Sequence, residues 1–143
     1  MKNKGFTLVE ILVVVVIIGV LAALVLPRFV GRTEDARKAS AKTQVSSLFG
    51  SALDMYEADN GSYPTTEQGL AALRVEPTTD PVPKNWKGPY LKNDIAKDPW
   101  GHEYVYVCPG IQNPTEYDLY SIGPDGEDGT DDDVTSWVKE ESK

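Results

Sequence analysis

The sequence predicts an α+β fold in which a long N-terminal helix packs against a small antiparallel β-sheet near the C-terminus. Three observations predict it: an unbroken apolar run at 11–26, a helical repeat of small and apolar residues at 41–55, and β-prone segments at 102–108 and 116–123. Helical and strand patterns therefore occupy separate parts of the chain, as in α+β proteins. A chain of 143 residues allows one domain.

The apolar run is long enough to cross a membrane. No residue from Ile11 to Leu26 is charged or polar, and only Thr7 and Glu10 interrupt the stretch that begins at Phe6. A helix needs about 20 apolar residues to span the hydrocarbon core. A cleaved secretory signal is the alternative, but its apolar region is usually about 7–15 residues long, and "LAALVLPRF" is a poor cleavage site. We therefore predict a membrane-spanning helix at 6–29, in which Glu10 is an unusual carboxylate that calls for a partner or a task.

A further helical stretch is predicted at 33–60. Thr33 is a plausible N-cap, and Gly61 offers a C-terminal stop. Pro27 lacks an amide proton and should kink or locally open the helix. Steps of four and three residues trace one helix face, which should cover the globular domain. The residues on this face are Ala41, Val45, Leu48, Ala52 and Met55.

Residues 61–98 predict a packed connecting loop. The stretch "NGSYPTTEQGLAALRVEPTTDPVPKNWKGPYL" holds five prolines around a short helical piece near Glu67–Arg74. Its expected apolar anchors are Leu70, Leu73, Trp86 and Tyr90. The runs "HEYVYVC" and "EYDLYSIG" then predict an antiparallel hairpin within 99–138.

Composition excludes several classes of function. The chain carries 22 acidic and 14 basic residues and a net charge of -8 at pH 7, which argues against nucleic acid as a partner. One histidine and one cysteine leave few ways to build a His-based or thiol-based active site. We expect His102 to be a turn or strand-edge residue and Cys108 a small buried side chain. The chain is not expected to be an enzyme.

The acidic segment "IGPDGEDGTDDDV" is the strongest candidate for a ligand site. Six carboxylates lie between Asp125 and Asp133 without a basic residue, and Gly123, Gly126 and Gly129 allow turns that direct carbonyls inward. Hard oxygen ligands in this number suit calcium, whereas zinc would require cysteine or histidine. A solvated acidic tail is the alternative. The spacing is not that of an EF-hand, because Gly129 occupies the fifth position, where a ligand is required.

The N-terminal stretch "KGFTLVEILVVVVIIGVLAALVLP" resembles the start of type IV pilins and type II secretion pseudopilins: a short basic leader, Gly, Phe, and Glu four residues later. The resemblance implies that residues 1–5 are a leader, that a prepilin peptidase cuts between Gly5 and Phe6, and that the same enzyme N-methylates Phe6. It implies that Glu10 pairs with the new N-terminus of a neighbouring subunit. It also implies that the helix loses order between Gly19 and Pro27 on assembly.

The rest of the chain resembles the major pseudopilins of type II secretion. The motifs are "ALDMYEADNGSYPTTEQGLAAL", "PKNWKGPYL", "KDPWGHEYVY" and "YDLYSIGPDGEDG", and with the N-terminal motif they cover nearly the whole chain. The cysteine pair that usually closes the C-terminal loop of adhesive pilins is missing from this sequence.

The resemblance implies a structural subunit, stored as a single-pass protein of the bacterial inner membrane with residues 30–143 in the periplasm. It would form a homopolymeric periplasmic filament that drives folded proteins through the outer-membrane secretin. Its other partners would be minor pseudopilins and an inner-membrane assembly platform powered by a cytoplasmic ATPase. The alternatives are a subunit of a type IV pilus or competence pseudopilus, and a membrane-anchored calcium-binding module that stays monomeric.

The resemblance also implies calcium in the acidic segment. Matched motif by motif, Ile122 falls on a carbonyl ligand and Asp125 on a carboxylate ligand. The downstream carboxylates are assigned to Asp132 and Asp133, with Asp131 as the alternative to either. The remaining expected ligands are the carbonyls of Glu127 and Thr130.

Overall fold

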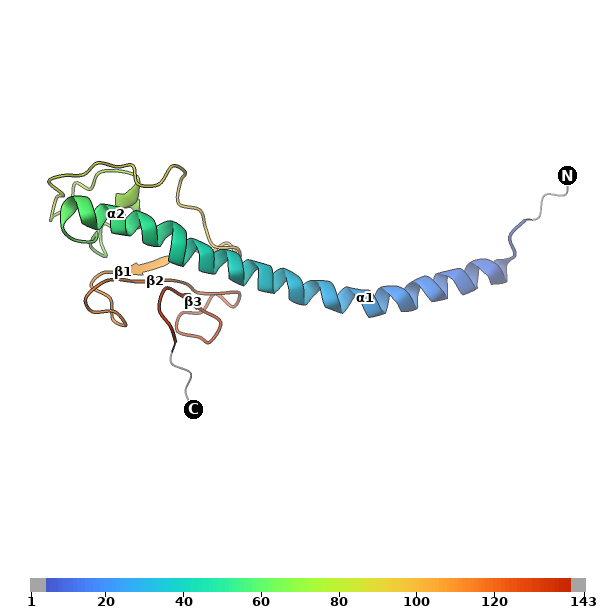
Figure 1. Cartoon of the computed structure of the whole chain (residues 1–143). Helices are drawn as coiled ribbons and strands as arrows, with labels where there is room; N and C mark the ends of the chain where they lie inside the picture. Colours follow the sequence, from blue (N-terminus) through green and yellow to red (C-terminus); the bar gives the residue numbers. More distant parts are fainter. Residues whose placement is uncertain (1–4, 140–143) are drawn as a thin grey trace. The chain divides into compact units, whose positions relative to one another are not determined.

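The structure, a computed structural model, describes residues 5–139, with side chains outside the description at 25–30 (Figure 1). Residues 1–4 of the predicted leader lie outside the described part. The chain divides into two units, Met1–Ala36 and Arg37–Lys143. The elements in order are α1 (Leu8–Thr43), the π-helical turn η1 (Gln44–Phe49), α2 (Gly50–Asn60), the 3-10 helix η2 (Leu70–Leu73), β1 (Val105–Val107), β2 (Asp118–Ser121) and β3 (Val134–Thr135).

Helix α1 is continuous from Leu8 to Thr43, so no separate helix begins at 33. The prediction of Thr33 as an N-cap is wrong, and α1 shows no opening at Pro27. A proline removes one backbone hydrogen bond, and the turns on either side of it here remain helical. The loss of helical order that the resemblance implies concerns the assembled state and stays a prediction. Within the described residues, no helix combines the length and the hydropathy needed to cross a membrane.

The buried face of the helical segment at 41–56 matches the predicted one at Ala41, Val45 and Ala52 and differs at the other two positions. Leu48 and Met55 are 52% and 58% exposed, whereas Phe49 and Tyr56 are buried. The cause is η1, because a π-helical turn takes up more residues than an α-helical turn and shifts the later positions around the axis. Gly61 ends α2 as predicted, with φ of 79° and its N–H donating to the carbonyl of Glu57 at 2.7 Å.

The loop after α2 is packed, as predicted, although its helical piece is only Leu70–Leu73. Leu73 is fully buried, and Trp86 Nε1 donates to the carbonyl of Ala72 at 3.0 Å. A Cβ atom at Gly88 would lie 2.3 Å from the Trp86 ring, so only glycine fits beneath this indole. In Figure 1 this loop lies on one side of α2 and the sheet on the other.

The sheet has the order β1-β2-β3 with both pairs antiparallel. The predicted hairpin is confirmed as β1 and β2, with Val105 opposite Tyr120. Strand β3 was not predicted; it pairs Val134 with Ser121 and so returns the chain to the sheet after the acidic segment. The hydrophobic core joins this sheet to the helices and includes Val45, Phe49, Leu53, Tyr56, Leu73, Tyr104, Tyr106 and Leu119.

Candidate functional site

The acidic segment is a loop closed at both ends by the sheet. Residues 122–133 connect β2 to β3, and the pair of Ser121 and Val134 brings the two ends together. Gly123 has φ of 67°, and a Cβ there would lie 2.7 Å from the carbonyl oxygen of Asp132. Glycine is therefore required where the loop begins, because a side chain would meet both backbone strain and a clash. Because the sheet pairs both of its ends, the segment is a closed loop rather than a free tail, although Asp125, Glu127, Asp128 and Asp131 are exposed.

Hydrogen bonds connect five of the expected ligand residues. The hydroxyl of Thr130 donates to Asp132 Oδ1 at 2.6 Å and to the carbonyl of Glu127 at 3.3 Å. Asp125 accepts from the N–H of Glu127 at 2.9 Å and donates its own N–H to Asp132 Oδ2 at 3.3 Å. Asp133 Oδ1 accepts from the Thr130 hydroxyl at 3.5 Å, and its Oδ2 accepts from the N–H of Gly129 at 2.9 Å.

The two remaining candidate ligands, Ile122 and Asp131, take no part in these hydrogen bonds as described and differ in exposure. Ile122 is half-buried at the start of the loop, directly after β2. Asp131 is exposed, whereas Asp132 and Asp133 are half-buried. Asp131 is therefore the least enclosed of the three downstream carboxylates, and the assignment of Asp132 and Asp133 as ligands stays a prediction.

The adjacent carboxylates Asp132 and Asp133 have opposite pKa shifts. The hydrogen bond from the Thr130 hydroxyl is the largest cause that lowers the pKa of Asp132. Burial raises the pKa of Asp133, and the negative charges of Asp128 and Asp132 add to this, while the Gly129 amide and Lys139 oppose it. The loop therefore holds a carboxylate whose charge is unfavourable in the folded protein, which a bound cation would relieve.

The donor set fits calcium by its chemistry. All expected ligands offer carboxylate or carbonyl oxygens, the ligands that calcium prefers. As placed, however, the described residues include no group of three or more His, Cys, Asp or Glu side chains arranged to hold a metal ion. Binding would therefore require the carboxylates to reorient within the loop.

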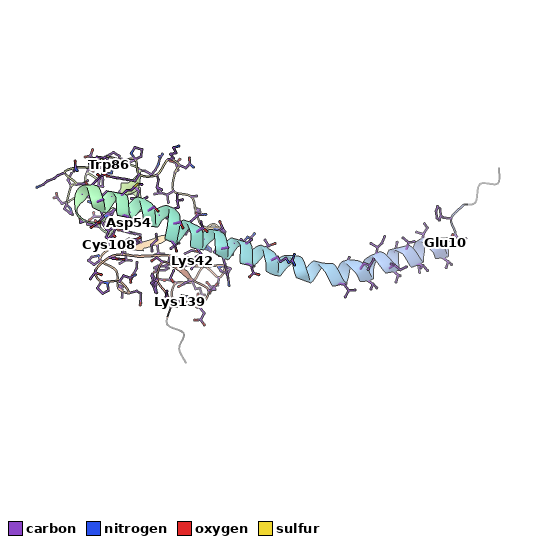
Figure 2. The ribbon with its side chains drawn as sticks, in the orientation of Figure 1. Glu10, Lys42, Asp54, Trp86, Cys108 and Lys139 are labelled. Carbon is purple, nitrogen blue, oxygen red and sulfur yellow. The ribbon has the colours of Figure 1, made fainter. Side chains whose placement is uncertain are left out.

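A lysine lies against the same loop. Lys139 Nζ, labelled in Figure 2, donates to the carbonyl of Thr130 at 2.9 Å and to that of Asp131 at 3.3 Å. The Thr130 carbonyl is an expected calcium ligand, so the ammonium group of Lys139 contacts an oxygen that the prediction assigns to the metal.

Three residues or pairs that are expected to have no catalytic role have the following places in the fold. His102 lies in the turn before β1, as predicted. Cys108 is half-buried rather than buried, and its N–H donates to the Thr66 hydroxyl at 2.9 Å. The rings of Tyr120 and Trp137 pack edge to face with centroids 5.6 Å apart, beside the acidic loop.

Glu10 has a local partner that the sequence reasoning missed. Glu10 Oε2 accepts hydrogen bonds from the N–H and the hydroxyl of Thr7, both at 3.0 Å, and the Glu10 N–H donates to the Thr7 hydroxyl at 3.2 Å (Figure 2). This reciprocal pattern is a capping box at the start of α1. Its signature, Thr followed three residues later by Glu, is visible in "TLVE".

The apolar side chains around Glu10 are exposed. Phe6 is 82% exposed and Leu24 67%, and the large apolar residues between them are all about half exposed or more. An added Cβ at Gly5 or Gly19 would meet no atom of the described residues within 4 Å. The packing of the described residues therefore does not explain glycine at either position.

Comparisons with known proteins cover the whole of this architecture. The family model "Type II secretion system (T2SS), protein G" matches residues 28–137, and the "Prokaryotic N-terminal methylation motif" matches residues 1–26. The type II secretion system core protein G of Pseudomonas aeruginosa is 49% identical over 140 residues, which is 95% of this chain and 96% of the relative. The core protein G of Escherichia coli K12 is 52% identical over 137 residues, which is 95% and 92% of the two chains.

A solved structure agrees with these relatives. The crystal structure of the major pseudopilin from the type 2 secretion system of enterohaemorrhagic Escherichia coli matches with a TM-score of 0.67 and 39% identity. The match covers 75% of this chain and 87% of that one. The family models, the relatives that are about half identical over nearly their full length, and the solved structure all agree. The chain therefore belongs to the type II secretion system protein G family.

Proposed function

We propose that this chain is the major structural subunit of a type II secretion pseudopilus. Membership of the protein G family over residues 28–137 carries the proposal. The same membership disfavours a type IV pilus or competence pseudopilus subunit and a monomeric calcium-binding module. We expect no enzymatic activity, because the proposed role is mechanical and needs only assembly.

The exposed apolar part of α1 supports storage in a membrane and burial in a polymer. Burying one large apolar side chain contributes about 1.5–3 kcal/mol, and such side chains are exposed on Phe6 and along α1 from Leu8 to Leu24. Water is therefore a poor environment for this segment. We propose that it spans the inner membrane before assembly, with residues 30–143 in the periplasm, and packs against copies of itself in the filament.

The N-terminal motif supports processing by a prepilin peptidase. The packing of the described residues does not require glycine at Gly5. Recognition by another protein explains this glycine better, for example a protease cleft that the chain enters in extended form. Cleavage before Phe6 would leave Thr7 and Glu10 together, so the capping box would survive in the mature chain. Glu10 would then neutralise the methylated amine of a neighbouring Phe6 when subunits assemble.

We also propose that the loop at 122–133 binds calcium. The ligands would be the carboxylates of Asp125, Asp132 and Asp133 and carbonyls of the loop, namely those of Ile122, Glu127 and Thr130. Calcium would supply positive charge to a segment of six carboxylates and would displace Lys139 from the Thr130 carbonyl. The pKa shift of Asp133 supports this, because it reflects charge that burial disfavours.

The remaining partners follow from the proposed role. They are the prepilin peptidase, the minor pseudopilins, the inner-membrane assembly platform and the outer-membrane secretin. Gly19 and Pro27 would bound the part of α1 that loses helical order on assembly, and glycine at 19 is consistent with this because local packing leaves it unexplained.

The test is complementation of secretion. A strain that lacks this chain should retain type II substrates in the periplasm, and the full-length chain should restore their release. Glu10→Ala should be present in the membrane but fail to restore release or to appear in sheared filaments. Glu76→Ala removes an equally exposed carboxylate from the connecting loop and should behave as the parent. Normal secretion in the strain without this chain would refute the role.

A further inference from the structure

A buried carboxylate, Asp98, lies at the turn that leads into β1. Its side chain is fully buried. Asp98 Oδ1 accepts hydrogen bonds from the backbone N–H groups of Trp100 at 3.1 Å and His102 at 2.8 Å. One oxygen of this carboxylate therefore fixes the turn at 98–102.

The second oxygen of Asp98 faces the start of the acidic loop. Asp98 Oδ2 accepts a hydrogen bond from Ser121 Oγ at 2.5 Å, and Ser121 is itself fully buried. Ser121 Oγ in turn accepts from the N–H of Gly123 at 3.2 Å. A chain of two hydrogen bonds thus runs from Asp98 to the backbone at the first glycine of the loop.

The imidazole of His102 connects the same carboxylate to the second glycine. Its Nδ1 lies 3.6 Å from Asp98 Oδ2 and has no hydrogen-bond partner among the described residues. On the other side of the ring, a Cβ at Gly126 would lie 3.1 Å from Nε2. The ring therefore lies between Asp98 and the loop backbone at Gly126, close to both.

These three residues are not arranged as a nucleophilic triad. In such a triad the serine hydroxyl donates to histidine, whereas here Ser121 donates to Asp98 and is buried. The arrangement instead resembles the outer shell of a metal site, in which hydrogen-bonded groups orient the residues that carry the ligands.

We infer that Asp98, acting through Ser121 and His102, positions the acidic loop for a divalent cation. The three residues hold the backbone at Gly123 and Gly126, on either side of Asp125, the first carboxylate of the loop. This inference rests on the calcium binding proposed above. It adds a positioning role for residues that are not themselves ligands.

The experiment compares single variants of the full-length chain in detergent. Ser121→Ala removes the connection to Gly123 and leaves the turn at 98–102 intact. Asp98→Asn keeps an acceptor for that turn and replaces the oxygen facing Ser121 with an amide donor. Asp94→Asn is the matched control, because it makes the same charge change at an exposed carboxylate that pairs with Arg74.

Two measurements are made on each protein: calcium affinity by titration calorimetry, and hydrogen exchange of the loop at 122–133 in chelator. We expect Ser121→Ala and Asp98→Asn to raise the calcium Kd by roughly 10- to 100-fold, the usual effect of losing an outer-shell partner, and to speed exchange in the loop. Asp94→Asn should match the parent in both. If Asp98→Asn does not fold, Ser121→Ala and His102→Ala give the answer.

The outcomes separate this inference from the calcium proposal. An unchanged Kd and unchanged loop exchange in Ser121→Ala would overturn the positioning role even if the parent binds calcium. If the parent binds no calcium, the calcium proposal fails, and the inference that the loop is positioned for a cation fails with it. Faster loop exchange in Ser121→Ala would then show a structural connection only.

Discussion

Asp118 offers the sharpest test of how the sheet is stabilised. This buried carboxylate at the start of β2 accepts hydrogen bonds from three successive backbone N–H groups of the hairpin loop. Its Oδ2 accepts from Ile111 at 2.6 Å and Gln112 at 2.7 Å, and its Oδ1 accepts from Asn113 at 3.0 Å. Replacing Asp118 with alanine would leave all three N–H groups without this acceptor.

The magnitude follows from these bonds. A hydrogen bond to a charged group contributes about 1.5–3 kcal/mol, but Ile111 and Gln112 are exposed, so water can replace part of the loss. We therefore expect Asp118→Ala to lower the free energy of unfolding by about 3 kcal/mol. At about 4 °C per kcal/mol for a unit of this size, the melting temperature should fall by roughly 12 °C. Asp118→Asn should lose about half as much, since its single oxygen can still serve Ile111 and Gln112.

The assay is thermal unfolding of the full-length chain in detergent, followed by circular dichroism in chelator so that calcium has no influence. Glu116→Gln is the control, because Glu116 is an exposed carboxylate of the same hairpin loop. A melting temperature for Asp118→Ala within 2 °C or so of the control would refute the reasoning, since an error of that size corresponds to only about 0.5 kcal/mol.

Four further predictions concern the other features. Calcium at 100 times its Kd should stabilise the chain by about 2.7 kcal/mol and raise its melting temperature by several degrees; equal melts of parent and Asp125→Ala in calcium would contradict this. Gly88→Ala should destabilise the fold by about 1–3 kcal/mol through overpacking against Trp86, and an unchanged urea midpoint would count against it. Burial first, and then the charge of Asp98, raise the pKa of Tyr104 to about 12. The neutral Tyr104 phenol therefore stabilises the folded state fully below pH 10, and the free energy of unfolding should fall as pH rises toward 12. Ionisation of Tyr104 near pH 10 in the folded chain, followed by absorbance at 295 nm, would contradict this. Gly5→Leu should leave an uncut precursor by intact-mass analysis in cells that contain the peptidase, and a mature chain beginning at Phe6 would disprove the processing assignment.

The elements that the sequence predicted well are those set by local pattern. Alternating β-prone residues predicted the hairpin of β1 and β2, and Gly61 predicted the end of α2. The exposed faces of Leu48 and Met55 were not predictable, because a π-helical turn leaves no mark on a 3.6-residue repeat. Continuity of α1 through Pro27 was missed, since proline and glycine there have the composition of a helix boundary.

The acidic loop could be recognised as a candidate site because like charges concentrate in one short segment, whereas its ligands rest on the family resemblance and stay a prediction. The contacts that hold the start of this loop could not be predicted from the sequence. Asp98 is 23 residues from its partner Ser121, and such a pairing depends on the tertiary fold. Strand β3 is only two residues long, too short for any alternation to appear. By contrast, the capping box of Thr7 and Glu10 is visible in the sequence, because both of its residues lie within one local motif, Thr followed three residues later by Glu.

The short length of β3 sets the order in which the domain opens. Beyond its pairing with β2, the segment is tied down by the N–H of Ser136 donating to the carbonyl of Leu119 at 2.8 Å and by Lys42 Nζ donating to the carbonyl of Thr135 at 2.7 Å. These bonds, the bond from the Gly123 N–H to Ser121 and the packing of Trp137 on Tyr120 all lie close to the two short ends of the segment. Residues 122–139 should therefore detach as one cooperative unit, at a lower free energy than global unfolding. A protease that samples the native chain would then cut first in this C-terminal segment and leave the helix and the first hairpin as a resistant fragment.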